Sequence, residues 1–395
     1  MKYKIESVDS TFALHIVSRS FSILASLVIL RITLSDFVLS DFVQVQLHYG
    51  LVSILFWFAD LGLLNYSIIL FSEKKFFYSK RVMSTRFWLI LLFFIIYALI
   101  QVINFGRVEV LVLIVAIFFD ISTDSLNGFR QVAASMKYSV ISLAAKKICQ
   151  LIFILFIIQQ NEKVTLINYS FAILIPSILV FFYDSRFLHF NLRFFDTSYV
   201  RKSKDIWFQS GGTSLANFDI PILTSLNGVV AVPVFVVSRK FSNALGIFGS
   251  TLVPQSMSDA ASNRITTQKS LSRSISVALL VLIFSLVIIV CASPILEKFF
   301  KINPNKSNLT LFVAVLLIAP LGVISSNLNA LLIATNRSRL AAVATYSSSI
   351  SYLGLIVIGC LTSKPYIGLL MAVFMNLVIE VCLQLFFLRR ELLNE

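Results

Sequence analysis

The sequence predicts an all-α, polytopic membrane protein with about twelve transmembrane helices, arranged as two six-helix bundles around a central cavity. Of the 395 residues, 58% are hydrophobic and only 13% are charged, whereas soluble domains carry roughly 25% charged residues. Apolar windows of about 20 residues recur along the whole chain, and each is long enough to cross a bilayer core as a helix. We therefore expect a chain that is embedded in a membrane throughout.

The apolar segments follow one another with short connections. We expect the first to remain uncleaved, because the N-terminal stretch is weakly basic and no small-residue cleavage site follows it. In the seventh segment, Pro221 is expected to kink the helix beside Asp219. The ninth segment has no charged residue and is expected to face lipid. The predicted spans are 11–34, 42–70, 87–105, 109–129, 138–159, 164–183, 206–226, 229–252, 274–293, 308–332, 340–361 and 366–388.

The connections between the spans fall into two sets that differ in charge. The set that includes both termini holds 21 Lys and Arg residues, and the opposite set holds six. Because basic residues concentrate in cytoplasmic loops, both termini are expected in the cytoplasm. Orientation thus explains the net charge of +14, and we expect no nucleic-acid partner. The basic connection 184–205 lies near mid-chain and predicts two bundles, residues 1–195 and 196–395.

Several spans carry cations, although a charged side chain at the bilayer centre costs about 2.5 to 3.5 kcal/mol on insertion scales. Residues three or four positions apart share one helix face. By this spacing, three spans place a cation beside hydroxyl or amide side chains, which suits a phosphate ligand. Arg239 lies about 16 Å along its predicted helix from the nearer end, too deep to reach the interface readily. The candidate binding residues are Arg19, Lys146, Lys147, Arg239, Lys240 and Asn243.

Acidic side chains also occur inside the predicted spans. Asp120 and Asp124 share a helix face, and Glu380 shares one with the amides Asn376 and Gln384. The full set of intramembrane carboxylates singled out is Asp60, Asp120, Asp124, Asp219 and Glu380.

Two interpretations of these charges remain open. In the first, Asp219 pairs with Arg239 and Asp120 pairs with Lys146, and each pair packs one helix onto another. In the second, the charges line a water-filled cavity of mixed sign, which also accounts for the serines and amides on the same faces. Under the second interpretation Arg239 is the best candidate for a phosphate contact, and Lys240 either joins it or neutralises a neighbouring carboxylate.

No enzyme or cofactor signature is present in the sequence. There is no Gly-rich phosphate-binding loop, and the three His residues form no grouping with Ser and Asp at a recognisable spacing. The four cysteines lie in apolar segments without paired spacing, so neither a disulfide framework nor a metal site is indicated. We expect a protein that is not an enzyme and that uses no cofactor.

Three stretches resemble a known family. They are "FADLGLLN" in the second span, "NFDIPILTSLNGVVAVPVFVVSRKFSNALGIFGSTLVPQSMSDAAS" across the seventh and eighth, and "LNALLIATNRSRLAAVATYSSS" across the tenth and eleventh. With twelve spans and short loops, they resemble the Wzx-type O-antigen and polysaccharide flippases of the multidrug/oligosaccharidyl-lipid/polysaccharide exporter superfamily. Asp60, Asp219, Arg239 and Lys240 match family positions, whereas the other candidates come from helical periodicity alone.

The resemblance implies a function. Such proteins move an undecaprenyl-pyrophosphate-linked oligosaccharide across the bacterial cytoplasmic (inner) membrane for O-antigen, lipopolysaccharide or capsule synthesis. Their two bundles form a V around a cationic cavity and alternate between inward-open and outward-open states, driven by an ion gradient. One of the five carboxylates would then bind H⁺ or Na⁺. A polysaccharide polymerase and a chain-length regulator are the implied protein partners.

Two other functions remain as alternatives. A drug or small-cation antiporter of the same superfamily is expected to centre on acidic rather than basic side chains. A membrane-embedded polysaccharide polymerase or acyltransferase is expected to have a large external loop and a catalytic grouping, and the sequence has neither.

Overall fold

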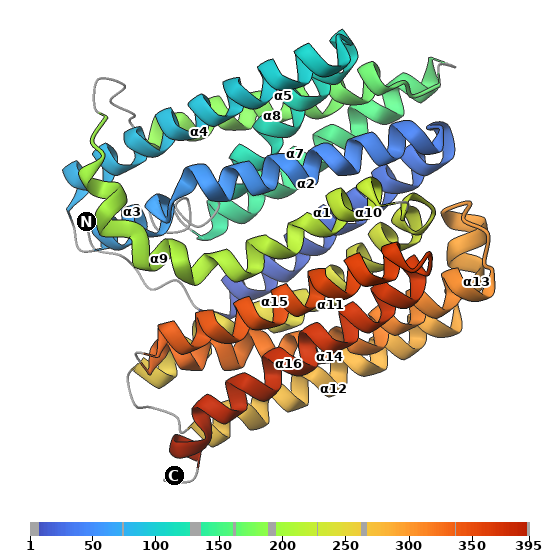
Figure 1. The fold of residues 1–395 in the computed structure, drawn as a ribbon. Coiled ribbons are helices and arrows are strands. Elements are labelled where there is room, and N and C mark those ends of the chain that lie inside the picture. The colour runs from blue at the N-terminus through green and yellow to red at the C-terminus, as the bar shows by residue number, and fades with distance from the viewer. Residues whose placement is uncertain are drawn as a thin grey trace. The chain divides into compact units, whose positions relative to one another are not determined.

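The computed structural model describes residues 8–72, 75–126, 136–160, 163–188, 195–226, 228–261, 267–335 and 337–392. Throughout these residues the regular secondary structure is helical, which confirms the predicted all-α class (Figure 1). The chain divides into two compact units, Met1–Phe208 and Gln209–Glu395. This boundary falls inside a helix, later than the connection at which the sequence predicts it.

The first unit is built around a buried central helix, α5. Its residues Leu113, Ile114, Ala116 and Ile117 are fully buried, and α2, α4 and α8 pack against it. The described helices of this unit are α1 (Val8–Asp36), α2 (Leu39–Asp60), α3 (Leu63–Ser72), α4 (Phe76–Phe105), α5 (Val108–Ser125), α7 (Met136–Gln159), α8 (Leu166–Leu188) and α9 (Ser198–Leu215), the last of which runs into the second unit.

The predicted second span is two helices rather than one. The break falls at Leu61 and Gly62, which both have positive φ angles of 47° and 74°. A Cβ atom at Gly62 would lie 2.6 Å from the backbone nitrogen of Trp207 and 2.8 Å from the carbonyl oxygen of Ser203. The Ser203 hydroxyl also donates to the Leu61 carbonyl at 2.8 Å. Helix α9 therefore packs directly on the break, which hydropathy alone does not reveal.

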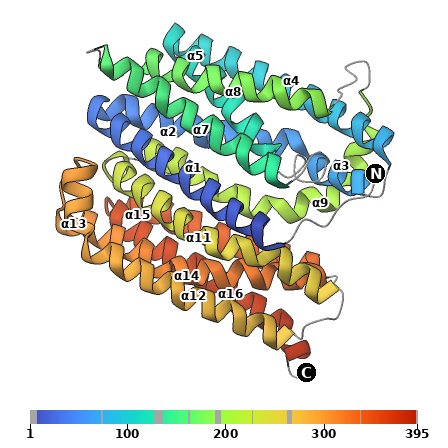
Figure 2. The ribbon, with the colours of Figure 1, turned by 180° about the vertical axis from the view of Figure 1, so that it is seen from behind.

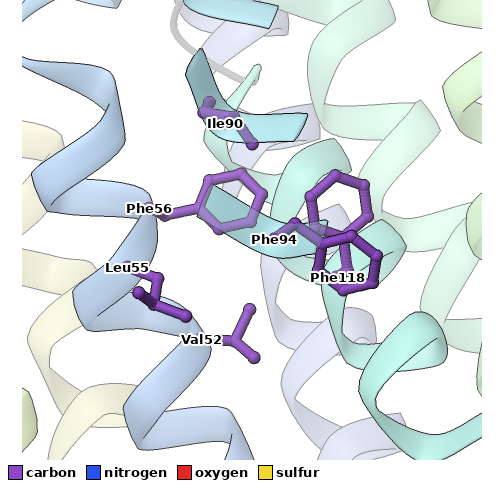
Figure 3. Close-up of a pocket in the computed structure, with 6 residues that line it drawn as sticks. All are labelled: Val52, Leu55, Phe56, Ile90, Phe94 and Phe118. Atoms are coloured by element: carbon purple, nitrogen blue, oxygen red, sulfur yellow. The ribbon is translucent and has the colours of Figure 1, made fainter. Parts of the chain in front are cut away.

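An apolar pocket lies between α2, α4 and α5 in the first unit. Figure 3 shows Phe56, Phe94 and Phe118 pointing toward one another, with Val52, Leu55 and Ile90 completing the lining. The Phe94 and Phe118 ring centroids lie 4.0 Å apart, and those of Phe56 and Phe118 lie 5.4 Å apart. At this position the helices are joined by aromatic packing and not by polar contacts.

The second unit begins with an interrupted helix. Pro221 cannot donate the backbone hydrogen bond that would reach the Asn217 carbonyl, and a 3₁₀ turn stands at that position. The helix is therefore interrupted beside Asp219, where the sequence predicts a kink. The elements of this unit are η1 (Ala216–Phe218), α10 (Asp219–Ser225), η2 (Val229–Ala231), α11 (Val232–Ala261), α12 (Thr267–Val290), α13 (Ala292–Pro294), the π-helical turn η3 (Ile295–Phe299), α14 (Lys306–Ala334), α15 (Ser338–Leu361) and α16 (Pro365–Leu392).

Ten helices in the described part of the chain are long and apolar enough to span a membrane. The other two predicted spans correspond to α5, which contains three acidic residues, and to the interrupted α9–α10 segment. Helices α12, α14 and α16 lie side by side in both views (Figures 1 and 2). Large apolar side chains of α12, among them Ile283 and Val287, are exposed, as expected for the segment predicted to face lipid.

Candidate functional site

The centre of the first polar cluster is Asp120 on α5, whose side chain is 4% exposed. A buried carboxylate is tolerated when cations and hydrogen-bond donors surround it. Three neighbouring helices supply such groups. The groups that contact the Asp120 carboxylate are Tyr49 of α2 (3.1 Å), Lys146, Lys147 and Gln150 of α7 (2.9, 3.2 and 2.8 Å), and Ser177 of α8 (3.3 Å).

Lys146 is fully buried, and its ammonium group is enclosed by α5. In addition to Asp120, Nζ contacts Asp124 Oδ1 at 2.5 Å and donates to Thr123 Oγ1 at 2.7 Å. An ammonium group has three donors, and these neighbours account for them. Lys147 is 19% exposed and bonds Gln150 at 3.0 Å as well as Asp120. Lys147 thus has the more accessible charge of the two.

A second ion pair in this unit involves a residue that the sequence reasoning missed. The predicted spans place Arg86 in a loop, but it lies well inside α4 and is buried. It pairs with Asp60 at the end of α2 and donates to the Ser125 hydroxyl at 3.1 Å. The available signal was its position directly before the apolar run that begins at residue 87.

In the second unit Asp219 forms the corresponding buried centre, with its side chain 1% exposed. It pairs with Arg239 of α11 and accepts a hydrogen bond from the Tyr352 hydroxyl of α15 at 2.9 Å. The Arg239 side chain is 36% exposed, and its guanidinium lies 5.6 Å from the Phe235 ring centroid. Arg239 therefore neutralises the neighbouring carboxylate. Tyr352 carried no sequence signal beyond its place in an apolar segment.

The depth predicted for Arg239 needs correction. Because α11 begins at Val232, Arg239 lies about 10 Å from the helix start at about 1.5 Å per residue. Lys240 and Asn243 are exposed on the same helix, and Arg19 on α1 is partly buried.

Glu380 of α16 has neutral neighbours. The hydroxyls of Thr345 and Ser325 and the amide of Gln384 hydrogen-bond it. It forms no ion pair with a Lys or Arg in the described residues. The structure thus brings together two groups of predicted residues, one in each unit: Asp120, Asp124, Lys146 and Lys147, and separately Asp219 and Arg239. The ion pairs weighed from the sequence, Asp120 with Lys146 and Asp219 with Arg239, are both present.

Comparison with known proteins gives a likeness in structure. No family model and no curated protein sequence matches the chain. The lipid II flippase MurJ in an inward closed conformation matches at 16% identity and a TM-score of 0.68, over 95% of this chain and 87% of that one. The MATE multidrug transporter DinF-BH matches at 14% identity and a TM-score of 0.66, over 97% of this chain and 95% of that one. The Vibrio cholerae MATE transporter VcmN in its bent form matches at 13% identity and a TM-score of 0.59, over 98% of this chain and 99% of that one.

Another solved structure of this fold is a multidrug resistance MATE family transporter of the MOP superfamily in its outward-facing conformation, at 15% identity and a TM-score of 0.61. The match spans 97% of this chain and 95% of that one. The chain therefore has the fold shared by the MurJ flippase and the MATE transporters of the MOP superfamily.

Proposed function

We propose that this chain is a flippase that moves an undecaprenyl-pyrophosphate-linked oligosaccharide across the bacterial cytoplasmic membrane for O-antigen, lipopolysaccharide or capsule synthesis. The fold supports a transporter, and the resemblance in "FADLGLLN" and in the stretch around Asp219 and Arg239 supports the polysaccharide branch. Both termini are placed in the cytoplasm, as the charge of the connections indicates.

One observation carries the proposal: in both units a buried carboxylate holds a cation that is more exposed than the carboxylate itself. Arg239 is 36% exposed against 1% for Asp219, and Lys147 is 19% exposed against 4% for Asp120. Lys240, next to Arg239, is exposed as well. In these two pairs the more accessible charge is positive, whereas in the Arg86–Asp60 and Lys146–Asp124 pairs the carboxylate is the more exposed partner.

This arrangement suits a pyrophosphate. The guanidinium of Arg239 has five donors in a planar fork, so that donors remain for phosphate oxygens after one binds Asp219. The buried carboxylate fixes the position of the cation in advance, and a pre-positioned group loses less entropy when a ligand binds. The anionic sugar-pyrophosphate head of this lipid cannot cross the hydrocarbon core unaided, whereas its polyprenyl tail is soluble in that core.

A drug or cation antiporter is the second candidate, and one residue favours it. The Asp124 side chain is 46% exposed, so the first unit also presents a carboxylate that a cationic substrate would contact. The MATE neighbours share this fold.

The test is deletion of the gene in its native host, followed by analysis of surface polysaccharide and lipid-linked precursors. We expect single repeat units to accumulate at the inner leaflet, and the gene supplied on a plasmid to restore export. Units that are accessible outside but unpolymerised would point to a polymerase. Normal polysaccharide combined with hypersensitivity to cationic drugs would point to an antiporter.

A further inference from the structure

Glu380 differs from the other four candidate carboxylates, Asp60, Asp120, Asp124 and Asp219, in the charge of its surroundings. Each of the four aspartates lies within ion-pair distance of a Lys or Arg: Asp60 with Arg86, Asp120 with Lys146 and Lys147, Asp124 with Lys146, and Asp219 with Arg239. No cation in the described part of the chain pairs with Glu380. Among these five carboxylates, its charge is therefore the one that no described cation balances.

The helices packed against α16 present neutral groups to Glu380. From α15, Thr345 Oγ1 lies 3.4 Å from Glu380 Oε1 and also donates to the Ala341 carbonyl at 3.0 Å, and from α14 the Ser325 hydroxyl bonds the carboxylate. Both side chains are 4% exposed. Among the charged groups of this region, Arg337, the residue directly before α15, donates to the Phe387 carbonyl at 2.6 Å. Lys269 and Arg273 on α12 are exposed, and neither pairs with Glu380.

The same region has more hydrogen-bond acceptors than donors. Gln384 is fully buried and donates its amide N–H to Glu380 at 3.2 Å, yet its own Oε1 has no hydrogen-bond partner. Asn376, one turn away on the same face of α16, also has an unpartnered buried oxygen, Oδ1. A buried acceptor without a partner costs about 1 to 3 kcal/mol. A donor or a small cation placed beside Glu380 would satisfy the oxygen of Gln384, whose amide already contacts the carboxylate.

We propose that Glu380 reversibly binds the coupling cation, taken up as H⁺ or as Na⁺ by the same oxygen-rich site. This rests on the proposed flippase function and on the ion-gradient drive that the family resemblance implies. On protonation the carboxylate becomes a carboxylic acid, which is an O–H donor that the buried Gln384 oxygen can accept. Sodium is a hard cation that favours oxygen ligands, and it would bind the carboxylate together with the nearby amide and hydroxyl oxygens. The four aspartates are already neutralised by fixed cations and do not take this role.

Labelling with dicyclohexylcarbodiimide tests the site without any lipid substrate. This apolar reagent reacts with protonated carboxyl groups, and mass spectrometry of the purified full-length protein locates the adduct. We expect the reagent to modify Glu380, and the extent of modification to decline as the pH rises. We expect no modification of the four aspartates. Glu380→Gln should lose the adduct, whereas Glu297→Gln, at an exposed glutamate of η3, should keep it. An aspartate adduct in place of one on Glu380 would overturn the proposal.

Two further arms identify the cation and its role. At fixed pH, protection of Glu380 by sodium chloride but not by choline chloride identifies Na⁺ as a ligand, and equal labelling in both salts identifies the proton. In cells, Glu380→Gln should abolish the dependence of polysaccharide export on the gradient of that cation, while Glu297→Gln retains it. Export that remains fully gradient-dependent in Glu380→Gln overturns the role. Failure of the flippase function shows instead in the gene-deletion experiment, which does not depend on this residue.

Discussion

Lys146 Nζ lies 2.5 Å from Asp124 Oδ1, yet the lysine side chain is fully buried while the aspartate is 46% exposed. The pair therefore bridges the interior of the first unit and its surface. Because the same ammonium also contacts Asp120, one lysine on α7 neutralises two positions, one turn apart, on α5.

Replacing Lys146 is expected to destabilise the first unit. Lys146→Ala removes the closest cation from the buried Asp120, and breaking a buried pair on one side costs about 3 to 5 kcal/mol. The amount of protein in the membrane and its melting temperature in detergent should both fall. Lys147→Ala is the matched control, because it removes a partly exposed lysine and leaves the buried Lys146 beside Asp120. Equal losses for the two variants would contradict the structure.

A double substitution separates ligand binding from helix packing at Arg239. Arg239→Ala alone leaves Asp219 buried without its cation, so both protein abundance and polysaccharide export should decline. Adding Asp219→Asn removes the stranded charge and should restore abundance, because an amide still bonds Tyr352. If Arg239 contacts the pyrophosphate, export stays low in the double variant. Export that recovers together with abundance would make Arg239 a packing residue only.

Gly62 is expected to be intolerant of a side chain for two reasons, which can be measured apart. Gly62→Ala forces a residue with a Cβ into a φ of 74° and brings that Cβ within 2.6 Å of the Trp207 backbone. Gly106 has a similar φ of 60° but open space around it. Gly106→Ala should therefore lower the free energy of unfolding only by the cost of the unfavourable φ angle, about 1 kcal/mol or slightly more. Gly62→Ala should lower it further, because the added Cβ also clashes with α9. Thermal unfolding of the purified variants compares them.

The orientation is testable with paired labelling sites. Cysteines introduced at Lys75, before α4, and at Lys301, after η3, should react with a membrane-impermeant maleimide in opposite compartments, after the natural cysteines are replaced by serine. We expect Lys301→Cys to react from outside intact cells and Lys75→Cys only after permeabilisation. The reverse pattern would invert the membrane topology.

Hydropathy predicted most of the fold, because a chain that crosses the bilayer must form long apolar helices in which the backbone N–H and C=O groups hydrogen-bond to one another. It did not predict the division of the second span, since the cause is the approach of α9 to Gly62, a contact between residues far apart in the sequence. The assignment of Arg86 to a loop failed for a related reason: helix α4 extends beyond its apolar core, and the charge there is neutralised by Asp60 on another helix.

The candidate site was predictable in its residues but only partly in its geometry. Helical spacing put Asp120 and Asp124 on a shared face, and both contact Lys146. Spacing along one helix cannot say which charges of different helices meet, so the choice between ion pairs and an open cavity stayed undecided. Tyr49 and Tyr352 were missed because a tyrosine in an apolar segment is first read as a packing residue. The sequence does not show that its hydroxyl hydrogen-bonds a carboxylate on another helix.

The contacts of Asp120 have a mechanical consequence. One carboxylate on α5 is bonded by side chains from α2, α7 and α8, so withdrawing any of these helices would remove a contact from a buried charge. We expect these four helices to stay together during transport as a rigid body. The bonds to Glu380 come from neutral groups, so within the described residues a shift of α16 would break no ion pair at this carboxylate.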